Sequence, residues 1–223
     1  MRCSRDAVLI VFMPQTRFCI VRHGETTWNA EKRIQGHIDV GLNAAGLAQA
    51  EAAANWLVGQ EIAAIYSSDL QRARQTAQRI AAVFNLVINL RPEFRERRYG
   101  VFEGRTYDES RQSFPQEYGA FERREPDFVI PGGESLVQLN QRVCDGLRQV
   151  ATDHPNQMVV VVTHGGVLDI INRLVRGTSL NMARDFLIPN ASISLIRYHN
   201  ENWHLESWGQ TKHLAMVGLD ELP

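Results

Sequence analysis

Short apolar runs alternate with longer amphipathic stretches along most of the chain. The runs at 17–22, 62–68, 86–90 and 158–164 have the length of strands. The last of them is apolar on both faces, as strands of a parallel sheet are. In the stretches between them, apolar residues recur every three or four positions, which indicates helices. This alternation predicts an α/β fold, a three-layer α/β/α sandwich in which helices cover both faces of a mostly parallel central sheet.

The intervening stretches are expected to form helices, and the last part of the chain a two-stranded hairpin. The helices span 43–59, 69–84, 135–153 and 165–177, and the hairpin strands 191–198 and 202–208. Asn43 and Asp69 are suited to cap the first two helices. The buried faces of the first and third helices are predicted to contain Leu47, Ala50, Ala54, Leu57 and Val58, and Val137, Val143, Leu147, Val150 and Ala151, respectively.

These elements form one expected domain at 17–214, between an N-terminal extension at 1–16 and a C-terminal tail at 215–223. The apolar run in the extension is too short to span a membrane. It also lacks the small-residue cleavage site of a signal peptide. Translation from Met13 explains the extension better than a cleaved signal does.

Residues 91–133 depart from the alternation of strands and helices. They are rich in arginine, glutamate, aromatic residues, glycine and proline. Frequent glycine and proline residues are typical of irregular segments. We expect a loop-rich insertion over the functional site, with one helix near 106–120.

Composition excludes several classes of protein. The chain has 223 residues, 44% hydrophobic and 22% charged, with a net charge of −1. This is an ordinary globular composition without the basic field of a nucleic-acid-binding protein. Arginine supplies most of the positive charge, since lysine occurs only at Lys32 and Lys212. The widely spaced Cys3, Cys19 and Cys144 match neither a disulfide framework nor a metal motif, which favours reduced thiols in a cytoplasmic protein.

Chemistry-bearing residues follow three of the expected strands. Arg22 and His23 follow the first strand, Arg72 lies near the start of the helix after the second, and His164 ends the strand at 158–164. Each has an ordinary explanation alone: a hydrogen-bonded histidine, an ion-paired surface arginine, or a capping residue. Ligands of parallel sheets bind beyond the carboxyl ends of the strands, where these residues would converge beside helix N-termini. Such a cluster suits a phosphate group, and a neutral imidazole can attack phosphorus.

The chain also contains a series of short sequence motifs, which together span nearly its whole length. They comprise RHGET at 22–26, RIQGHIDVGL at 33–42, GLAQA at 46–50, SSDLQRARQTA at 67–77, FRERRYGVFEG at 94–104, GGES at 132–135, THGG at 163–166 and KHL at 212–214. With these motifs the chain resembles the histidine phosphatase superfamily, in its phosphoglycerate-mutase-like branch. That branch includes cofactor-dependent phosphoglycerate mutases and broad-specificity phosphatases.

The resemblance implies a role for each core residue. His23 is the nucleophile that becomes phosphohistidine, and Arg22 and Arg72 bind the phosphoryl group. His164 contacts and stabilises the phosphoryl group during transfer. Glu96 is the general acid for the leaving group and then the base for water. All members of this core set are present.

Further candidates would bind the substrate. Asn29 and Gln35 match polar residues on the phosphate side of the pocket, and Gly165 offers its backbone N–H. In the insertion, the candidates for binding the rest of the substrate are Arg98, Tyr99, Arg105, Arg123 and Arg124. A solvated turn paired with Glu122 and Glu125 is the simpler explanation of the last two arginines.

The chemistry also sets expectations for protonation and metals. His23 must be neutral on its attacking nitrogen, so its other nitrogen should donate to a backbone carbonyl. His164 is expected to be cationic when phosphate is bound. A rival interpretation makes His23, His164 and Glu96 a metal site, but Arg22 and Arg72 would repel a cation there. We therefore expect no metal and no other cofactor.

The short insertion favours hydrolysis over phosphoryl transfer to a second hydroxyl. Only 27 residues separate Gly104 from Gly132, and a mutase needs a lid that protects phosphohistidine from water. We predict a phosphomonoester hydrolase acting on a small anionic phosphorylated metabolite. The alternatives are a phosphoglycerate mutase primed by 2,3-bisphosphoglycerate and a non-catalytic phosphoester-binding scaffold. Neither nucleic acid nor a membrane is an expected partner, and a homodimer stays open.

Overall fold

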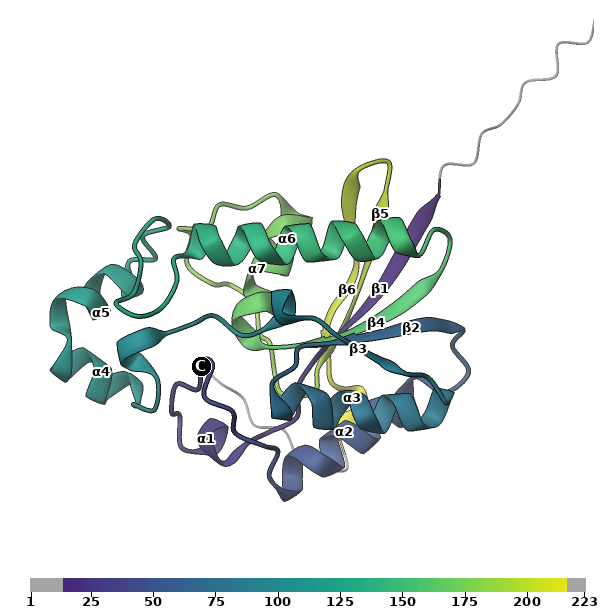
Figure 1. Cartoon of the computed structure of the whole chain (residues 1–223), viewed down its shortest axis with the longest axis horizontal. Coiled ribbons are helices and arrows are strands. Elements are labelled where there is room, and N and C mark those ends of the chain that lie inside the picture. The colour runs from purple at the N-terminus through teal and green to yellow at the C-terminus, as the bar shows by residue number, and fades with distance from the viewer. Residues whose placement is uncertain (1–13, 216–223) are drawn as a thin grey trace, which may run out of the picture.

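The structure is a computed structural model that describes residues 14–215. Its described part forms three layers (Figure 1), with α6 and α7 on one face of a six-stranded sheet and α2 and α3 on the other. This confirms the predicted α/β architecture. The expectations for a start at Met13 and for residues 216–223 lie outside the described residues.

The sheet is parallel over four strands and ends in an antiparallel hairpin. Its strands are β1 (Gln15–Arg22), β2 (Ile62–Ser67), β3 (Ile88–Leu90), β4 (Met158–Thr163), β5 (Ile193–His199) and β6 (Asn202–Gln210). Their order is β3-β2-β4-β1-β5-β6, with β5 and β6 antiparallel to their neighbours. In the register of the sheet, Arg22 is opposite Thr163 and Ser67 is opposite Val162. The residues that follow β1, β2 and β4 therefore emerge side by side at one edge.

The helices cover the sheet and the edge where the functional residues gather. They are α1 (Thr27–Ala30), α2 (Ala44–Trp56), α3 (Gln71–Phe84), α4 (Tyr107–Ser113), α5 (Pro115–Glu122), α6 (Leu136–Asp153) and α7 (Gly165–Arg176). Short 3-10 turns are η1 (Pro92–Phe94), η2 (Gly100–Phe102) and η3 (Lys212–Leu214). Within the described residues, no helix combines the length and apolar composition of a membrane span.

The central strands contribute to two hydrophobic cores at once. In β1, Phe18 and Ile20 belong to the core under α6 and α7, whereas Cys19 and Val21 belong to the core over α2 and α3. Successive side chains of a strand point to opposite faces, so a strand between two helical layers must be apolar throughout. This explains the uninterrupted valine run of β4, which is buried along its whole length.

The insertion differs from the expected loop with one helix. It contains two helices, α4 and α5, because Pro115 interrupts the predicted helix. Proline lacks an N–H and disfavours a helical conformation in the residue before it, so Phe114 ends α4 and a new helix starts at Pro115. The two helices enclose a small aromatic core around Phe102 and Tyr118, and the insertion lies beyond one end of the sheet (Figure 1).

Three predicted core residues, Leu47, Val58 and Val137, are exposed, which corrects the expected stripes. In α2 the buried face follows the smallest residues, such as Ala50 and Ala53, and Val58 lies beyond the helix end.

Asp69 is also not the cap of α3. Leu70 occupies that position without a side-chain hydrogen bond, and the Asp69 carboxylate pairs with Arg95 instead.

The first turn of α2 lies directly against the backbone that follows β1, and a glycine occupies each side of this contact. A Cβ atom on Gly46 would lie 2.0 Å from the carbonyl oxygen of Glu25, and one on Gly24 would lie 2.3 Å from the carbonyl oxygen of Gly46. Both contacts are with backbone atoms, which move less readily than side chains. The close approach therefore ties α2 to the turn that carries His23.

We predict that Gly46→Ala lowers the free energy of unfolding by about 1–3 kcal/mol, because overpacking outweighs the better helix propensity of alanine. Gly119→Ala in α5 is the matched control, since its Cβ would meet only the flexible end of Arg123. The control should be neutral or up to about 1 kcal/mol more stable. Urea unfolding measures both, and equal stability of the two variants would contradict the close approach.

Candidate active site

His23 is buried at the end of β1 and holds a defined tautomer. Its Nδ1 lies 2.7 Å from the Gly24 carbonyl oxygen. A carbonyl can only accept, so Nδ1 carries the hydrogen and Nε2 keeps a lone pair. Burial, followed by the charges of Arg72 and Arg22, holds the pKa of His23 well below its usual value. The imidazole is therefore neutral and its Nε2 carries a free lone pair.

His164 is buried beside it, at the end of β4, and is also neutral. The two imidazole rings are 5.1 Å apart between centroids. Arg72 Nε donates to His164 Nδ1 over 3.2 Å, so the neutral ring carries its hydrogen on Nε2. Burial, with Arg72 as the next cause, lowers the pKa of His164 well below its usual value. The expected cationic form would require this Arg72 contact to break.

Two buried guanidinium groups flank the histidines. Arg72 donates to the carbonyl oxygens of Gly36 and Ile38 over 2.8 and 3.0 Å, in addition to His164. Arg22 donates through Nη1 to the Ile188 carbonyl, and its buried Nε has no partner among the described residues. Burial lowers the pKa of each arginine to about 10, so both remain charged at neutral pH.

Glu96 lies across from the histidines, at the N-terminus of α7. Its carboxylate accepts from the backbone N–H of Gly166 at 2.9 and 3.1 Å and from that of Arg97 at 2.7 Å. A Cβ on Gly166 would lie 2.3 Å from the Glu96 carboxylate, so glycine makes this contact possible. Free N–H groups at a helix N-terminus favour a negative group at this position.

The backbone around Glu96 is held by Arg142 of α6. This guanidinium donates to the carbonyl oxygens of Glu93, Arg95 and Glu96 at 2.7, 2.8 and 2.9 Å. A partly buried ion pair with Glu134 orients Arg142, and His37 Nε2 donates to the Glu96 carbonyl at 2.8 Å. These contacts place a residue from the irregular 91–133 segment as firmly as the strand ends place the histidines.

These side chains line one cavity of about 90 Å³, the phosphate pocket. The expected residues that line it are Arg22, His23, Asn29, Gln35, Arg72, Glu96, Tyr99 and Gly165. His164 lies behind the wall, in contact with Arg72. A larger opening of about 600 Å³ lies at the amino ends of β1, β2 and β4 and gathers no comparable cluster. The pocket is thus lined by four arginines and a lysine, by the imidazole of His23 and by one carboxylate, that of Glu96.

Four insertion arginines predicted to bind substrate, Arg98, Arg105, Arg123 and Arg124, do not line the phosphate pocket. Arg123 is exposed and pairs with Glu125 at 2.8 Å, as expected for the alternative of a solvated turn. Arg105 Nη1 donates to the Val101 carbonyl at 2.6 Å. Arg124 pairs with Asp169 at 2.5 Å and lines a neighbouring cavity.

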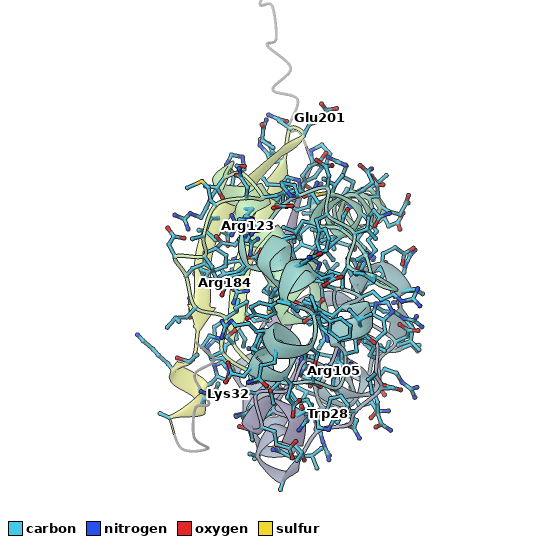
Figure 2. All side chains as sticks on the ribbon, turned by 90° about the vertical axis from the view of Figure 1, so that its left-hand side faces the viewer. Trp28, Lys32, Arg105, Arg123, Arg184 and Glu201 are labelled. Atoms are coloured by element: carbon cyan, nitrogen blue, oxygen red, sulfur yellow. The ribbon has the colours of Figure 1, made fainter. Side chains whose placement is uncertain are left out.

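Other residues that line the pocket were not among the predicted site residues: Trp28, Lys32, Arg33, Tyr107 and Arg184. Figure 2 looks at this end of the molecule, where Trp28, Lys32 and Arg184 lie around the insertion helices. Arg184 lies between α7 and β5, in a stretch without periodic pattern or family motif. The presence of an arginine was the only local feature that could have indicated a role in the site. Within residues 14–215, no group of three or more His, Cys, Asp or Glu side chains is arranged to hold a metal ion.

Comparison with known proteins confirms the family predicted from the motifs. The model of the histidine phosphatase superfamily (branch 1) matches residues 18–211. A metal-independent phosphoserine phosphatase of Arabidopsis thaliana is 43% identical, covering 92% of this chain and 85% of the relative. Phosphoglycerate mutase-like protein 4 of the same plant is 40% identical, covering 90% and 87%.

The solved structures include a mutant phosphoserine phosphatase from Entamoeba histolytica in complex with phosphoserine. It superimposes with a TM-score of 0.81 at 28% identity, covering 89% of this chain and 99% of that one. The match extends over the strands that carry the cluster as well as the surrounding helices. The chain belongs to the histidine phosphatase superfamily, branch 1.

Proposed function

We propose that this chain hydrolyses small anionic phosphomonoesters through a phosphohistidine formed on His23. The protonation state of His23 carries the proposal: Nδ1–H donates to the Gly24 carbonyl, which leaves a basic Nε2 in the phosphate pocket. An imidazole in this state is a competent nucleophile. The family and the metal-independent phosphoserine phosphatase relative support a phosphoric monoester hydrolase.

In the first step, His23 Nε2 attacks phosphorus while the bond from phosphorus to the ester oxygen breaks. Arg22 and Arg72 bind the equatorial oxygens, where negative charge is concentrated. Neutral His164 can donate a further hydrogen bond to the phosphoryl group through its Nε2–H, which has no partner among the described residues. Glu96 transfers a proton to the departing ester oxygen, so an alcohol leaves rather than an alkoxide.

The second step returns the enzyme to its starting state. Glu96, now a carboxylate, takes a proton from water as the water oxygen attacks phosphorus. The bond between phosphorus and His23 Nε2 then breaks, and inorganic phosphate leaves. Microscopic reversibility requires one group to serve as acid and then base, and the Gly166 N–H that holds the Glu96 carboxylate supports this assignment.

The residues of the pocket also support a role in binding. Asn29, Gln35 and the insertion residue Tyr99 belong to the wall of the pocket. Residue Asn29 is itself oriented by Thr26 and Asn190, which bond its side-chain oxygen. We assign these groups to the phosphate and to the first atoms of the leaving group.

A phosphoglycerate mutase is the second candidate, because a mutase-like protein is 40% identical to this chain and the same catalytic residues serve both reactions. The short insertion favours the hydrolase. A scaffold that only binds phosphoesters is a weaker candidate, since every core residue is retained.

Phosphate release from a panel of phosphomonoesters separates the first two candidates. We expect phosphoserine or a related phosphorylated acid to be hydrolysed without added metal and equally well in EDTA, because the chemistry uses only side chains. Conversion of 3-phosphoglycerate to 2-phosphoglycerate with a bisphosphoglycerate primer, and with little phosphate release, would identify a mutase instead. Activity lost in EDTA and restored by a divalent metal would contradict the metal-free mechanism.

We predict that His23→Ala lowers kcat by at least about 10³-fold, because no other group can accept the phosphoryl group. Rapid-quench labelling with a 32P-phosphoester should trap a phosphoenzyme in the wild type and none in the variant. His204→Ala, an exposed histidine on β6, is the matched control and should behave as wild type. A variant with normal turnover would show that His23 is not the nucleophile.

We predict that Glu96→Gln loses more activity on alkyl phosphates than on p-nitrophenyl phosphate. An alcohol is a poor leaving group without a proton, so the loss should approach about 10²–10⁴-fold for alkyl esters. p-Nitrophenolate leaves without protonation, so its release in the first step should fall much less, as a pre-steady-state burst will show. The exposed Glu201→Gln is the control (Figure 2). If the rate of the first step falls by the same factor on both ester classes, Glu96 is not the acid.

A further inference from the structure

A second cavity adjoins the phosphate pocket on the side of α7. It has a volume of about 540 Å³ and lies between the insertion, α6, α7 and residues 184–188. We call it the side cavity. Arg184 and Ile188 belong to the walls of both cavities, as do Tyr99, Tyr107 and Gly166. Arg184 therefore lines the same cavity as His23, within which the phosphate and the rest of a substrate would lie.

The polar wall of the side cavity carries an excess of positive charge. The buried Asp169 carboxylate is shared by three arginines: Arg124 at 2.5 Å, Arg173 at 3.1 Å and Arg184 at 3.3 Å. Burial by itself would raise the pKa of Asp169, but hydrogen bonding to Arg173 and the charges of the other arginines lower it, so the carboxylate is ionised. The other acidic side chain in this wall, Asp185, is already paired with Arg176 at 2.7 and 3.0 Å.

Of the three arginines around Asp169, Arg184 is the least committed. Arg173 has a side chain only 3% exposed, contacts both Asp169 oxygens and also donates to the Ser179 carbonyl. Arg124 donates to the Leu180 carbonyl as well as to Asp169. Arg184 makes one contact, through Nε, and its side chain is 36% exposed. Within residues 14–215 its two terminal nitrogens have no hydrogen-bond partner.

Asp169 orients Arg184 without neutralising it. An Nε contact to a carboxylate fixes the plane of a guanidinium and leaves its terminal donors available to another acceptor. Two parallel donors match a carboxylate, which is why arginine binds this group bidentately. Because two other arginines share the charge of Asp169, a second anion beside Arg184 meets net attraction.

We propose that Arg184 is a specificity-determining residue that binds a carboxylate on the leaving group of the substrate. This inference rests on the proposed function and names its substrate class, a phosphomonoester of a small hydroxy acid or hydroxy amino acid. The phosphate binds at Arg22, His23 and Arg72, and the carboxylate binds at Arg184 on the border of the side cavity.

Phosphoserine and phosphoethanolamine isolate this contact, because they differ only in the carboxylate. We expect the wild type to prefer phosphoserine in kcat/KM, and Arg184→Gln to reduce the ratio of the two values at least about tenfold, the effect of losing a hydrogen-bonded charge. Arg184→Lys keeps the charge but not the paired donors, so its ratio should be intermediate. Arg148→Gln, at an exposed position of α6 outside both cavities, should keep the wild-type ratio.

Direct binding makes the test independent of turnover. Calorimetric titration of His23→Ala with each ester should show tighter binding of phosphoserine, and adding Arg184→Gln should abolish the difference. Equal losses on both esters, or no preference for phosphoserine in either measurement, would overturn the role of Arg184. Hydrolysis of p-nitrophenyl phosphate by the wild type tests the proposed function separately, because that ester carries no carboxylate.

Discussion

Two buried guanidinium groups at the carboxyl edge of the sheet determine how the surrounding segments are arranged. Arg22 and Arg72 remain charged although burial lowers the pKa of each to about 10. Desolvated donors must find acceptors inside the protein. The loop at 36–38 and the segment at 188 supply backbone carbonyls for this purpose, and His164 supplies a ring nitrogen. The segments that enclose the phosphate pocket are therefore the ones that satisfy the arginines. Burial, together with these positive charges, lowers the pKa of both histidines and keeps the imidazoles neutral.

The part of this arrangement that depends on regular structure could be predicted from the sequence. Parallel strands place their following residues at one edge, so the convergence of His23, Arg72 and His164 followed from periodicity and topology alone. The insertion resisted prediction because its core is formed by aromatic residues without a helical or strand period, and because Pro115 divides its helix. Arg184 resisted for a different reason: its position depends on Asp169, a contact between distant segments that no local pattern reveals.

Glu96 shows how a helix end can serve two successive states of one group. The N–H groups at 166 and 97 hold its carboxylate, a site at which a helix N-terminus favours negative charge. The mechanism that we propose requires this group as a carboxylic acid in the first step and as a carboxylate in the second. The helix end stabilises the second of these states.

The residues at the strand ends and the arginines around Asp169 differ in how freely they can be substituted. Arg22 and the two histidines lie at the ends of β1 and β4, strands that contribute to both hydrophobic cores. Arg124 and Arg184 arise from the insertion and from the stretch after α7, which pack on the edge of the sheet rather than within it. Substitutions at these two positions leave both cores of the sheet unchanged. A gene duplicate of this chain could thus acquire a new substrate through changes at these two positions while its chemical step stays intact.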